Sequence, residues 1–144
     1  GPLVSARQRD TVMGFIESAS TEGASVVSGG GQLADQGYYV SPTIIADVSP
    51  EMRVMREEIF GPVVCVSRFD DLDAVVKSAN ATRYGLAASV WTRDISAMHS
   101  LARSIKAGTV WGNGSVAKIV KLEHAWRRLD GRNDDGFQVA PFPG

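Results

Sequence analysis

The chain has 144 residues, a formal net charge of −1 and 44% apolar residues, a composition typical of a globular domain. The near-neutral charge argues against a general nucleic-acid-binding protein, which normally carries a basic excess. No run of 18 apolar residues exists and the first residues lack a secretory pattern, so we expect no membrane partner and a cytoplasmic location. A single cysteine, Cys65, excludes an internal disulfide.

The N-terminal half combines one amphipathic helix with short strands. Ser5 is placed to cap a helix that runs through about Ala19. The apolar stripe of this helix consists of Val12, Phe15, Ile16 and Ala19. A short strand is predicted at 24–28. A second strand, at 38–45, is broken in two by Pro42, which favours a sheet edge or a bend.

A strand–helix–strand–helix–strand alternation follows. The strands are predicted at 62–69, 86–92 and 109–111. The helices between them are capped by Asp70 or Asp71 and by Asp94, and the second one includes Lys106 in its last turn. The first of these strands is strongly apolar, so we expect it to be buried. The alternation predicts an α/β fold with an open, mostly parallel sheet.

Four features that could carry chemistry also have ordinary explanations. Cys65 lies among valines on a strand, where burial raises the pKa of a thiol and favours a core cysteine over a nucleophile. His99 and His124 lack the spacing of metal ligands, so no metal site is expected. The segment "GGGQLA" (29–34) imitates a dinucleotide fingerprint but leaves no room for a helix, so it is interpreted as a turn. The segment "GNGSVA" (112–117) follows a strand and opens a possible helix, which leaves a small nucleotide-binding module as a further hypothesis.

Two adjacent carboxylates, Glu57 and Glu58, stand in "MREEIFGPVV" directly before the apolar strand. Neighbours in an extended chain point to opposite faces, so these two are not expected to form a paired acid–base site. From the local pattern alone, the simplest interpretation is one solvated carboxylate and one at the entrance to the strand.

The segment "EEIFGPV", followed by "NATRYGLAASVWT", resembles the aldehyde dehydrogenase superfamily. The segments "GPLVSARQRDTVMGFI", "GYYVSPTIIADV" and "LARSIKAGTVW" occur in family order, so the resemblance covers residues 1–111. It implies a partial catalytic domain at 1–113 with a three-layer, open, mostly parallel sheet. The tail at 114–144 resembles nothing in the family and contains a possible helix at 115–129, followed by a loop.

The resemblance also implies roles for individual residues. Glu58 corresponds to a glutamate that hydrogen-bonds the ribose hydroxyls beside the nicotinamide, and Phe60 to an aromatic that lies against the nicotinamide end of the cofactor. Glu57 would face the opposite side and be structural. Asn113 corresponds to the asparagine that precedes a loop lining the aldehyde pocket. The cofactor would be NAD or NADP, the substrate a small aldehyde, and the parent enzyme a homo-oligomer.

The mechanism that the resemblance implies is covalent. A cysteine thiolate attacks the aldehyde to form a thiohemiacetal, a hydride passes to NAD(P)⁺, and a glutamate-activated water releases the acid. In the family this cysteine and this glutamate lie further before the "EEIFGP" motif than the start of this chain. We therefore expect no catalytic residue here and no activity from the chain alone. The alternative is a non-catalytic partner that docks on an intact aldehyde dehydrogenase through an open sheet edge or the helix at 115–129.

Overall fold

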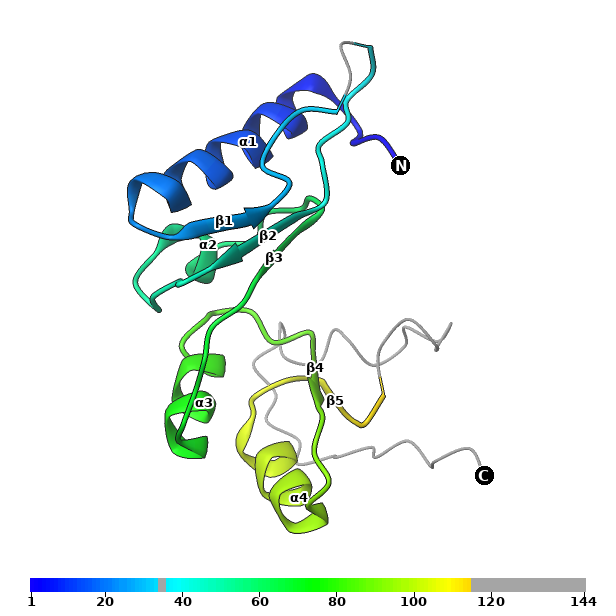
Figure 1. Cartoon of the computed structure of the whole chain (residues 1–144). Helices are drawn as coiled ribbons and strands as arrows, with labels where there is room; N and C mark the ends of the chain where they lie inside the picture. The colour runs from blue at the N-terminus through cyan, green and yellow to red at the C-terminus, as the bar shows by residue number, and fades with distance from the viewer. Residues whose placement is uncertain (34–35, 115–144) are drawn as a thin grey trace. The chain divides into compact units, whose positions relative to one another are not determined.

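The computed structural model describes residues 1–33 and 36–114, which belong to two compact units divided after Asp70 (Figure 1). The first unit contains α1 (Ala6–Thr21), β1 (Ser25–Ser28), β2 (Thr43–Ala46), α2 (Arg53–Arg56) and β3 (Val63–Cys65). The described part of the second unit contains α3 (Leu72–Ala79), β4 (Ala87–Val90), α4 (Ile95–Ser104) and β5 (Thr109–Gly112). None of the described helices is long and apolar enough to cross a membrane.

The strands form two sheets rather than one continuous sheet. In the first unit the order is β1-β2-β3, with β1 and β2 antiparallel and β2 and β3 parallel. In the second unit β4 and β5 pair in parallel. Parallel pairings therefore predominate, which confirms the predicted α/β class. Pro42 directly precedes β2, so the predicted break is at the start of this strand, although β2 is the central strand and not an edge.

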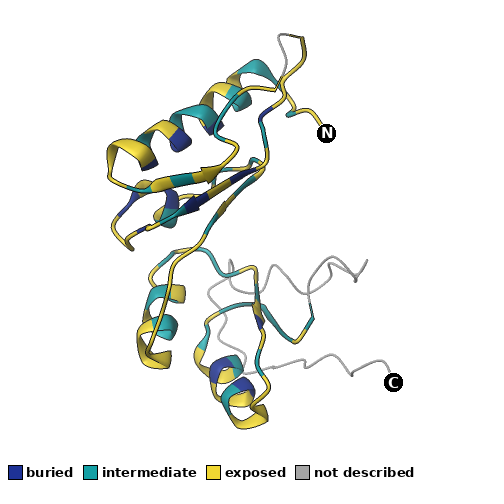
Figure 2. Cartoon of the chain, viewed as in Figure 1, coloured by how far each residue is buried: buried dark blue, intermediate teal, exposed yellow. Residues whose placement is uncertain are grey.

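The core of the first unit lies between α1 and one face of its sheet. Ser5 caps α1 by accepting a hydrogen bond from the Gln8 amide (3.2 Å), as the sequence predicts. Every residue of the predicted apolar stripe is buried (Figure 2). Phe15 and Ala19 pack in one cluster with Ile45 of β2, and Val12 and Ile16 pack in a second cluster. The alternation of β2 thus turns Ile45 toward the helix and leaves Ile44 40% exposed.

The expectation of a buried strand at 62–69 is wrong for the described structure. Only Val63–Cys65 form β3, and Val64 is 53% exposed. Val66 and Phe69, which follow the strand, are also exposed. The reason is position: β3 is one of the two outer strands of its sheet, and α1 and α2 pack on the face opposite Val64, where Ile44 of the central strand is exposed as well. Apolar composition alone does not distinguish a buried strand from an edge strand whose outer face is uncovered.

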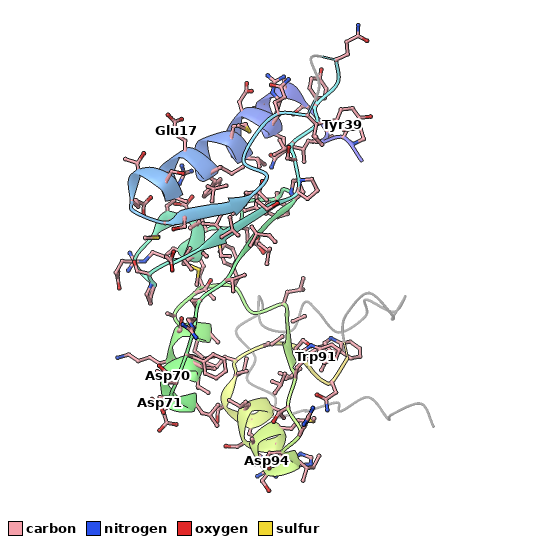
Figure 3. The ribbon with its side chains drawn as sticks, viewed as in Figure 1. Glu17, Tyr39, Asp70, Asp71, Trp91 and Asp94 are labelled. Carbon is pink, nitrogen blue, oxygen red and sulfur yellow. The ribbon has the colours of Figure 1, made fainter. Side chains whose placement is uncertain are left out.

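The second unit depends on caps and polar links more than on a core. Asp71 and Asp94, both labelled in Figure 3, cap α3 and α4 by accepting hydrogen bonds from main-chain amides of the first turns. The side chain of Asn80 then connects the two helix ends, donating to the Ser104 carbonyl (2.8 Å) and accepting from the Lys106 amide (2.7 Å). Helix α4 ends at Ser104, so Lys106 lies beyond it and not in its last turn.

Candidate functional site

Glu57 and Glu58 have different surroundings in the turn between α2 and β3. Glu57 is the C-terminal cap of α2, and its Oε1 lies 3.3 Å from Arg53 Nε, an i,i+4 ion pair along the helix. Glu58 is exposed, and its carboxylate makes no hydrogen bond or ion pair with any residue that the structure describes. The two neighbouring glutamates thus differ: Glu57 pairs with a side chain of its own helix, whereas Glu58 has no partner among the described residues.

Phe60 has an unusual backbone and an unusual environment. Its φ is +52°, in the left-handed region that residues with a bulky side chain rarely adopt. The residue is 74% exposed, although a large aromatic side chain gains most from burial. Local strain combined with an exposed apolar ring is typical of a position that is shaped for a ligand.

The N-terminal part of α1 packs against this turn and forms hydrogen bonds with it. Gln8 Nε2 donates hydrogen bonds to the carbonyl oxygens of Ile59 (3.2 Å) and Phe60 (2.9 Å). One turn further along the helix, the buried Val12 side chain lies so close to Gly61 that a β-carbon there would be 2.6 Å from Val12 Cγ2. The glycine of "EEIFGP" therefore allows the turn to lie directly on the helix.

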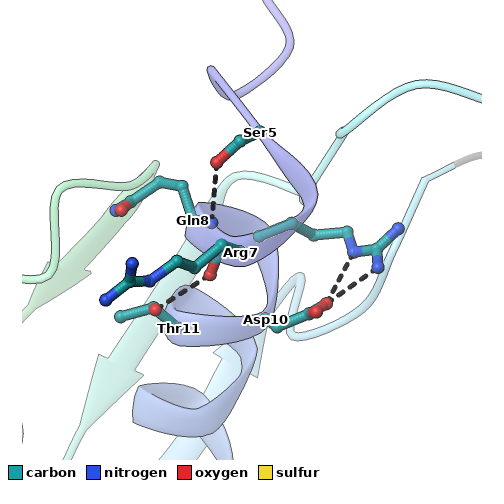
Figure 4. A network of polar contacts seen from close by, with 6 residues as sticks. Ser5, Arg7, Gln8, Asp10 and Thr11 are labelled. Atoms are coloured by element: carbon teal, nitrogen blue, oxygen red, sulfur yellow. Dashed lines mark hydrogen bonds and ion pairs between the residues drawn. The ribbon is translucent and has the colours of Figure 1, made fainter.

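Gln8 is a residue that the sequence analysis missed. The spacing Ser5-x-x-Gln8 is that of a capping box, in which the glutamine returns to the amide of the capping residue. In the structure only half of that arrangement forms: the Gln8 amide donates to Ser5, whereas its side chain reaches the turn that follows α2. Figure 4 shows the side chain extending away from the helix axis. The capping spacing identifies the residue, but not its distant partner.

Asn113 lies in the second unit, where its side chain binds the main chain at the end of β4. Its Oδ1 accepts from the Thr92 amide (2.9 Å) and its Nδ2 donates to the Thr92 carbonyl (3.0 Å). Its own amide donates to the Val90 carbonyl (2.8 Å), and its φ is +48°. Asn113 thus continues the pairing of β4 with β5 by one step.

The remaining candidates have ordinary surroundings. Cys65 is partly buried, and burial raises the pKa of its thiol, as expected for a cysteine that is not a nucleophile. His99 is exposed on α4, and His124 lies outside the described residues. Within residues 1–33 and 36–114, no cluster of three or more potential metal ligands is found.

A shallow depression of about 580 Å³ runs beside α1. It is lined by Arg7, Asp10, Thr11, Gly14 and Arg53, several of which are drawn in Figure 4. The Arg53 guanidinium is already engaged, because it lies 4.0 Å from the centre of the Phe15 ring and pairs with Glu57. Neither Glu58 nor Phe60 is among the lining residues.

Comparison with known proteins assigns the family. The model of the aldehyde dehydrogenase family matches residues 1–125. This chain belongs to the aldehyde dehydrogenase family. It is 50% identical over 113 residues to a mitochondrial aldehyde dehydrogenase of Leishmania tarentolae, covering 78% of this chain and 23% of the relative. It is 47% identical over 134 residues to a betaine aldehyde dehydrogenase of Rhizobium etli, covering 91% of this chain and 28% of the relative.

Solved aldehyde dehydrogenase structures have the same fold. The NAD⁺ complex of an aldehyde dehydrogenase from Bacillus cereus superposes with a TM-score of 0.74 at 47% identity, covering 78% of this chain and 23% of that one. An indole-3-acetaldehyde dehydrogenase in complex with NAD⁺ gives a TM-score of 0.78 at 45% identity, covering 81% and 24%. The aldehyde dehydrogenase fold is thus present over most of the chain.

The chain spans about a quarter of the length of the relatives that it matches. The family match continues past residue 113 to residue 125, whereas the sequence motifs predict a resemblance that ends at residue 111. The predicted helix at 115–129, and the part of "GNGSVA" that follows Gly114, lie outside the described residues. The division into a family domain at 1–113 and a tail at 114–144 therefore stays a prediction.

Proposed function

We propose that this chain supplies the part of an NAD(P)-dependent aldehyde dehydrogenase that holds the nicotinamide ribose. The observation that carries the proposal is the pair formed by Glu58 and Phe60. A carboxylate with no partner among residues 1–33 and 36–114 and an exposed aromatic side chain lie two residues apart on one strained turn. Two matched structures whose names include NAD⁺ support the choice of cofactor.

The chemistry of these residues fits a dinucleotide. An ionised carboxylate is an acceptor only, and a ribose diol offers two hydroxyl donors, so Glu58 would form charge-assisted hydrogen bonds without changing its protonation state. Phe60 offers an apolar face for the flat nicotinamide end of the ligand. Because Glu57 forms an ion pair with Arg53, the two neighbouring glutamates would not compete for the diol.

The cofactor, once bound, would accept a hydride from the aldehyde carbon. The residues of this chain would bind and orient it. NAD and NADP share the nicotinamide ribose, so the contacts assigned to Glu58 and Phe60 serve either one. Asn113, whose amide is occupied by Thr92, would shape the loop beside the aldehyde rather than touch the substrate.

The nucleophile of the reaction lies outside this chain in our proposal. Cys65 does not replace it, because its thiol has a raised pKa and lies after the motif rather than before it. The chain alone would therefore neither oxidise an aldehyde nor retain the cofactor, since two contacts do not offset the entropy lost on ordering a dinucleotide. Aldehyde-dependent formation of NADH or NADPH by the pure chain would contradict this part of the proposal.

The direct experiment is a chimera. Residues 1–113 replace the matching segment of a full-length relative, and aldehyde-dependent NADH formation is measured. We expect an active enzyme whose KM for the dinucleotide rises about tenfold or more when Glu58 is changed to glutamine, because a hydrogen bond to a charged group contributes about 1.5–3 kcal/mol. A folded chimera without activity, or one whose KM is unchanged by Glu58→Gln, would contradict the proposal.

A second candidate function is a non-catalytic partner that docks on an intact aldehyde dehydrogenase. The observation that favours it is the uncovered apolar face of the first sheet, on which Val27, Ile44 and Val64 are exposed. Co-purification of the chain with a full-length relative would support docking. An isolated monomer that shows no complex with that relative in gel filtration would count against it.

A further inference from the structure

The backbone of Phe60 is fixed from both sides by a single side chain. The Ile59 carbonyl belongs to the peptide plane that precedes the Phe60 α-carbon, and the Phe60 carbonyl belongs to the plane that follows it. Gln8 Nε2 donates to both oxygens, at 3.2 and 2.9 Å. Holding two successive peptide planes determines φ and ψ of the residue between them, and φ of Phe60 is +52°.

The position of Gln8 is itself fixed by helix α1. It lies in the first turn of α1, where its main-chain amide donates to the Ser5 capping hydroxyl. Val12, four residues later on the same helix face, packs against Gly61 and completes the support under the turn. The helix therefore offers a rigid apolar contact from Val12 and a directional polar contact from Gln8.

An aromatic residue whose backbone is in the left-handed region needs such support. This backbone region is disfavoured for a residue with a large side chain and persists only where surrounding contacts over-determine it. Within the turn, the Val63 amide donates to the Gly61 carbonyl (2.8 Å), a bond that closes around Pro62 and not around Phe60. The two hydrogen bonds from Gln8 are the contacts that act directly on the strained position.

We propose that Gln8 is a positioning residue that holds Phe60 in the left-handed conformation and thereby sets the direction in which the ring and the neighbouring Glu58 carboxylate meet the nicotinamide ribose. This inference rests on the proposed function of Glu58 and Phe60. Gln8 acts here through the main chain of the turn, without a contact between its side chain and the ligand.

The test is NMR of the 144-residue chain carrying Gln8→Glu. A carboxylate has no donor, so at neutral pH it cannot bind the two carbonyl oxygens. We expect Phe60 to leave the left-handed region, which is detected as loss of the strong cross-relaxation between its own amide and α protons, while the dispersed amide signals of α1 and β1 are retained. The wild-type chain should show this cross-relaxation throughout the pH range.

Acidification should partly reverse the change in Gln8→Glu. A protonated carboxyl group regains one O–H donor, and two facing carbonyl oxygens raise the pKa of the introduced group above the ordinary glutamate value of about 4.3. Gln8→Ala, which removes the donors without adding a titratable group, should lose the signal and not recover it. Gln36→Glu, the same substitution at an exposed loop position, is the matched control and should leave Phe60 unchanged.

Two results would overturn the inference. One is a folded Gln8→Ala chain in which Phe60 keeps its left-handed signature. The other is a general loss of amide dispersion in both Gln8 variants, which would make Gln8 a support of the whole fold rather than of the turn. In the chimera, Gln8→Glu should raise KM for the dinucleotide. If Gln8→Glu displaces the turn but leaves KM unchanged, the result would support the role of Gln8 in fixing Phe60 and contradict the proposed function of Glu58 and Phe60.

Discussion

The two units of the chain are stabilised in different ways. The first contains nine of the twelve buried apolar side chains among the described residues, and they lie on α1, β2, α2 and the segments beside these elements. The second contains three, Val90, Met98 and Leu101, and α3 has no buried residue at all. The turn with Glu58 and Phe60 is therefore supported by a packed core, whereas Asn113 lies in a unit held by helix caps and side-chain amides. A turn that contains a strained residue needs the more rigid support.

From the difference between the two units, we expect the largest change in stability from a substitution in the core of the first unit. Phe15→Ala should lower the free energy of unfolding of that unit by about 3–5 kcal/mol, because a buried aromatic leaves a cavity that the neighbouring residues fill only in part. Phe15 is 2% exposed and also lies beneath the Arg53 guanidinium. Urea denaturation followed by amide hydrogen exchange would measure each unit separately. Leu101→Ala is the counterpart in α4 and should cost less; an equal loss would contradict the contrast.

Two glycines sharpen the same contrast. Gly61→Ala would place a β-carbon against the stiff, fully buried Val12 side chain and should destabilise the first unit by about 1–3 kcal/mol. Gly112→Ala would meet Met98, whose flexible thioether can turn aside at lower cost. Thermal unfolding of the two variants should therefore show the larger loss for Gly61→Ala. The reverse order would mean that the turn does not lie firmly on α1.

The polar links of the second unit should contribute less than either core change. Asn80→Ala removes two hydrogen bonds to the main chain near the end of α4 and should cost about 1 kcal/mol, since exposed hydrogen bonds contribute little net stability. Asn80→Asp keeps the acceptor for the Lys106 amide but places a carboxylate oxygen, which has no donor, beside the Ser104 carbonyl. Hydrogen exchange at Lys106 would distinguish the two variants: protection lost in both would contradict the assignment of the acceptor.

The smallest effect concerns pH. The hydrogen bond from Ser18, and then the one from the Arg53 amide, lower the pKa of Glu22 from its ordinary value of 4.5. A lowered pKa means that Glu22 stabilises the folded state above pH 4.5 and that this contribution is lost as the pH falls through the folded-state pKa. Glu22→Gln should therefore flatten the acid side of the stability profile slightly. A profile identical to that of the wild type would show that the link between the end of α1 and the start of α2 has no effect.

Sequence reasoning succeeded where structure follows from neighbouring residues. The stripe on α1, the caps at Ser5 and Asp94, and the turn at the first glycine cluster are set by short-range geometry, and all are observed. Gly29 and Gly30 have φ of +75° and +87°, as a turn requires. The motif "EEIFGPV" likewise indicated the family, which the comparisons confirm.

What the sequence did not show depends on partners distant in the chain. Gln8 has the local spacing of a capping residue, but its partners lie 51 and 52 positions away. The exposure of Val64 depends on which strand lies at the edge and on which face the helices cover. The difference between Glu57 and Glu58 depends on the ion pair that Arg53 forms with Glu57. The sequence of two adjacent glutamates does not show which of them has this partner.

The most direct test of the account compares these two glutamates in the chimera. KM for NAD⁺ is measured for Glu58→Gln and for Glu57→Gln, which remove the same charge from adjacent positions. We expect Glu58→Gln to raise KM about tenfold or more, through lost charge-assisted hydrogen bonds of about 1.5–3 kcal/mol, whereas Glu57→Gln loses only an exposed ion pair and leaves KM unchanged. Equal effects, or a larger effect at Glu57, would contradict the assignment of Glu58 as the residue that holds the cofactor.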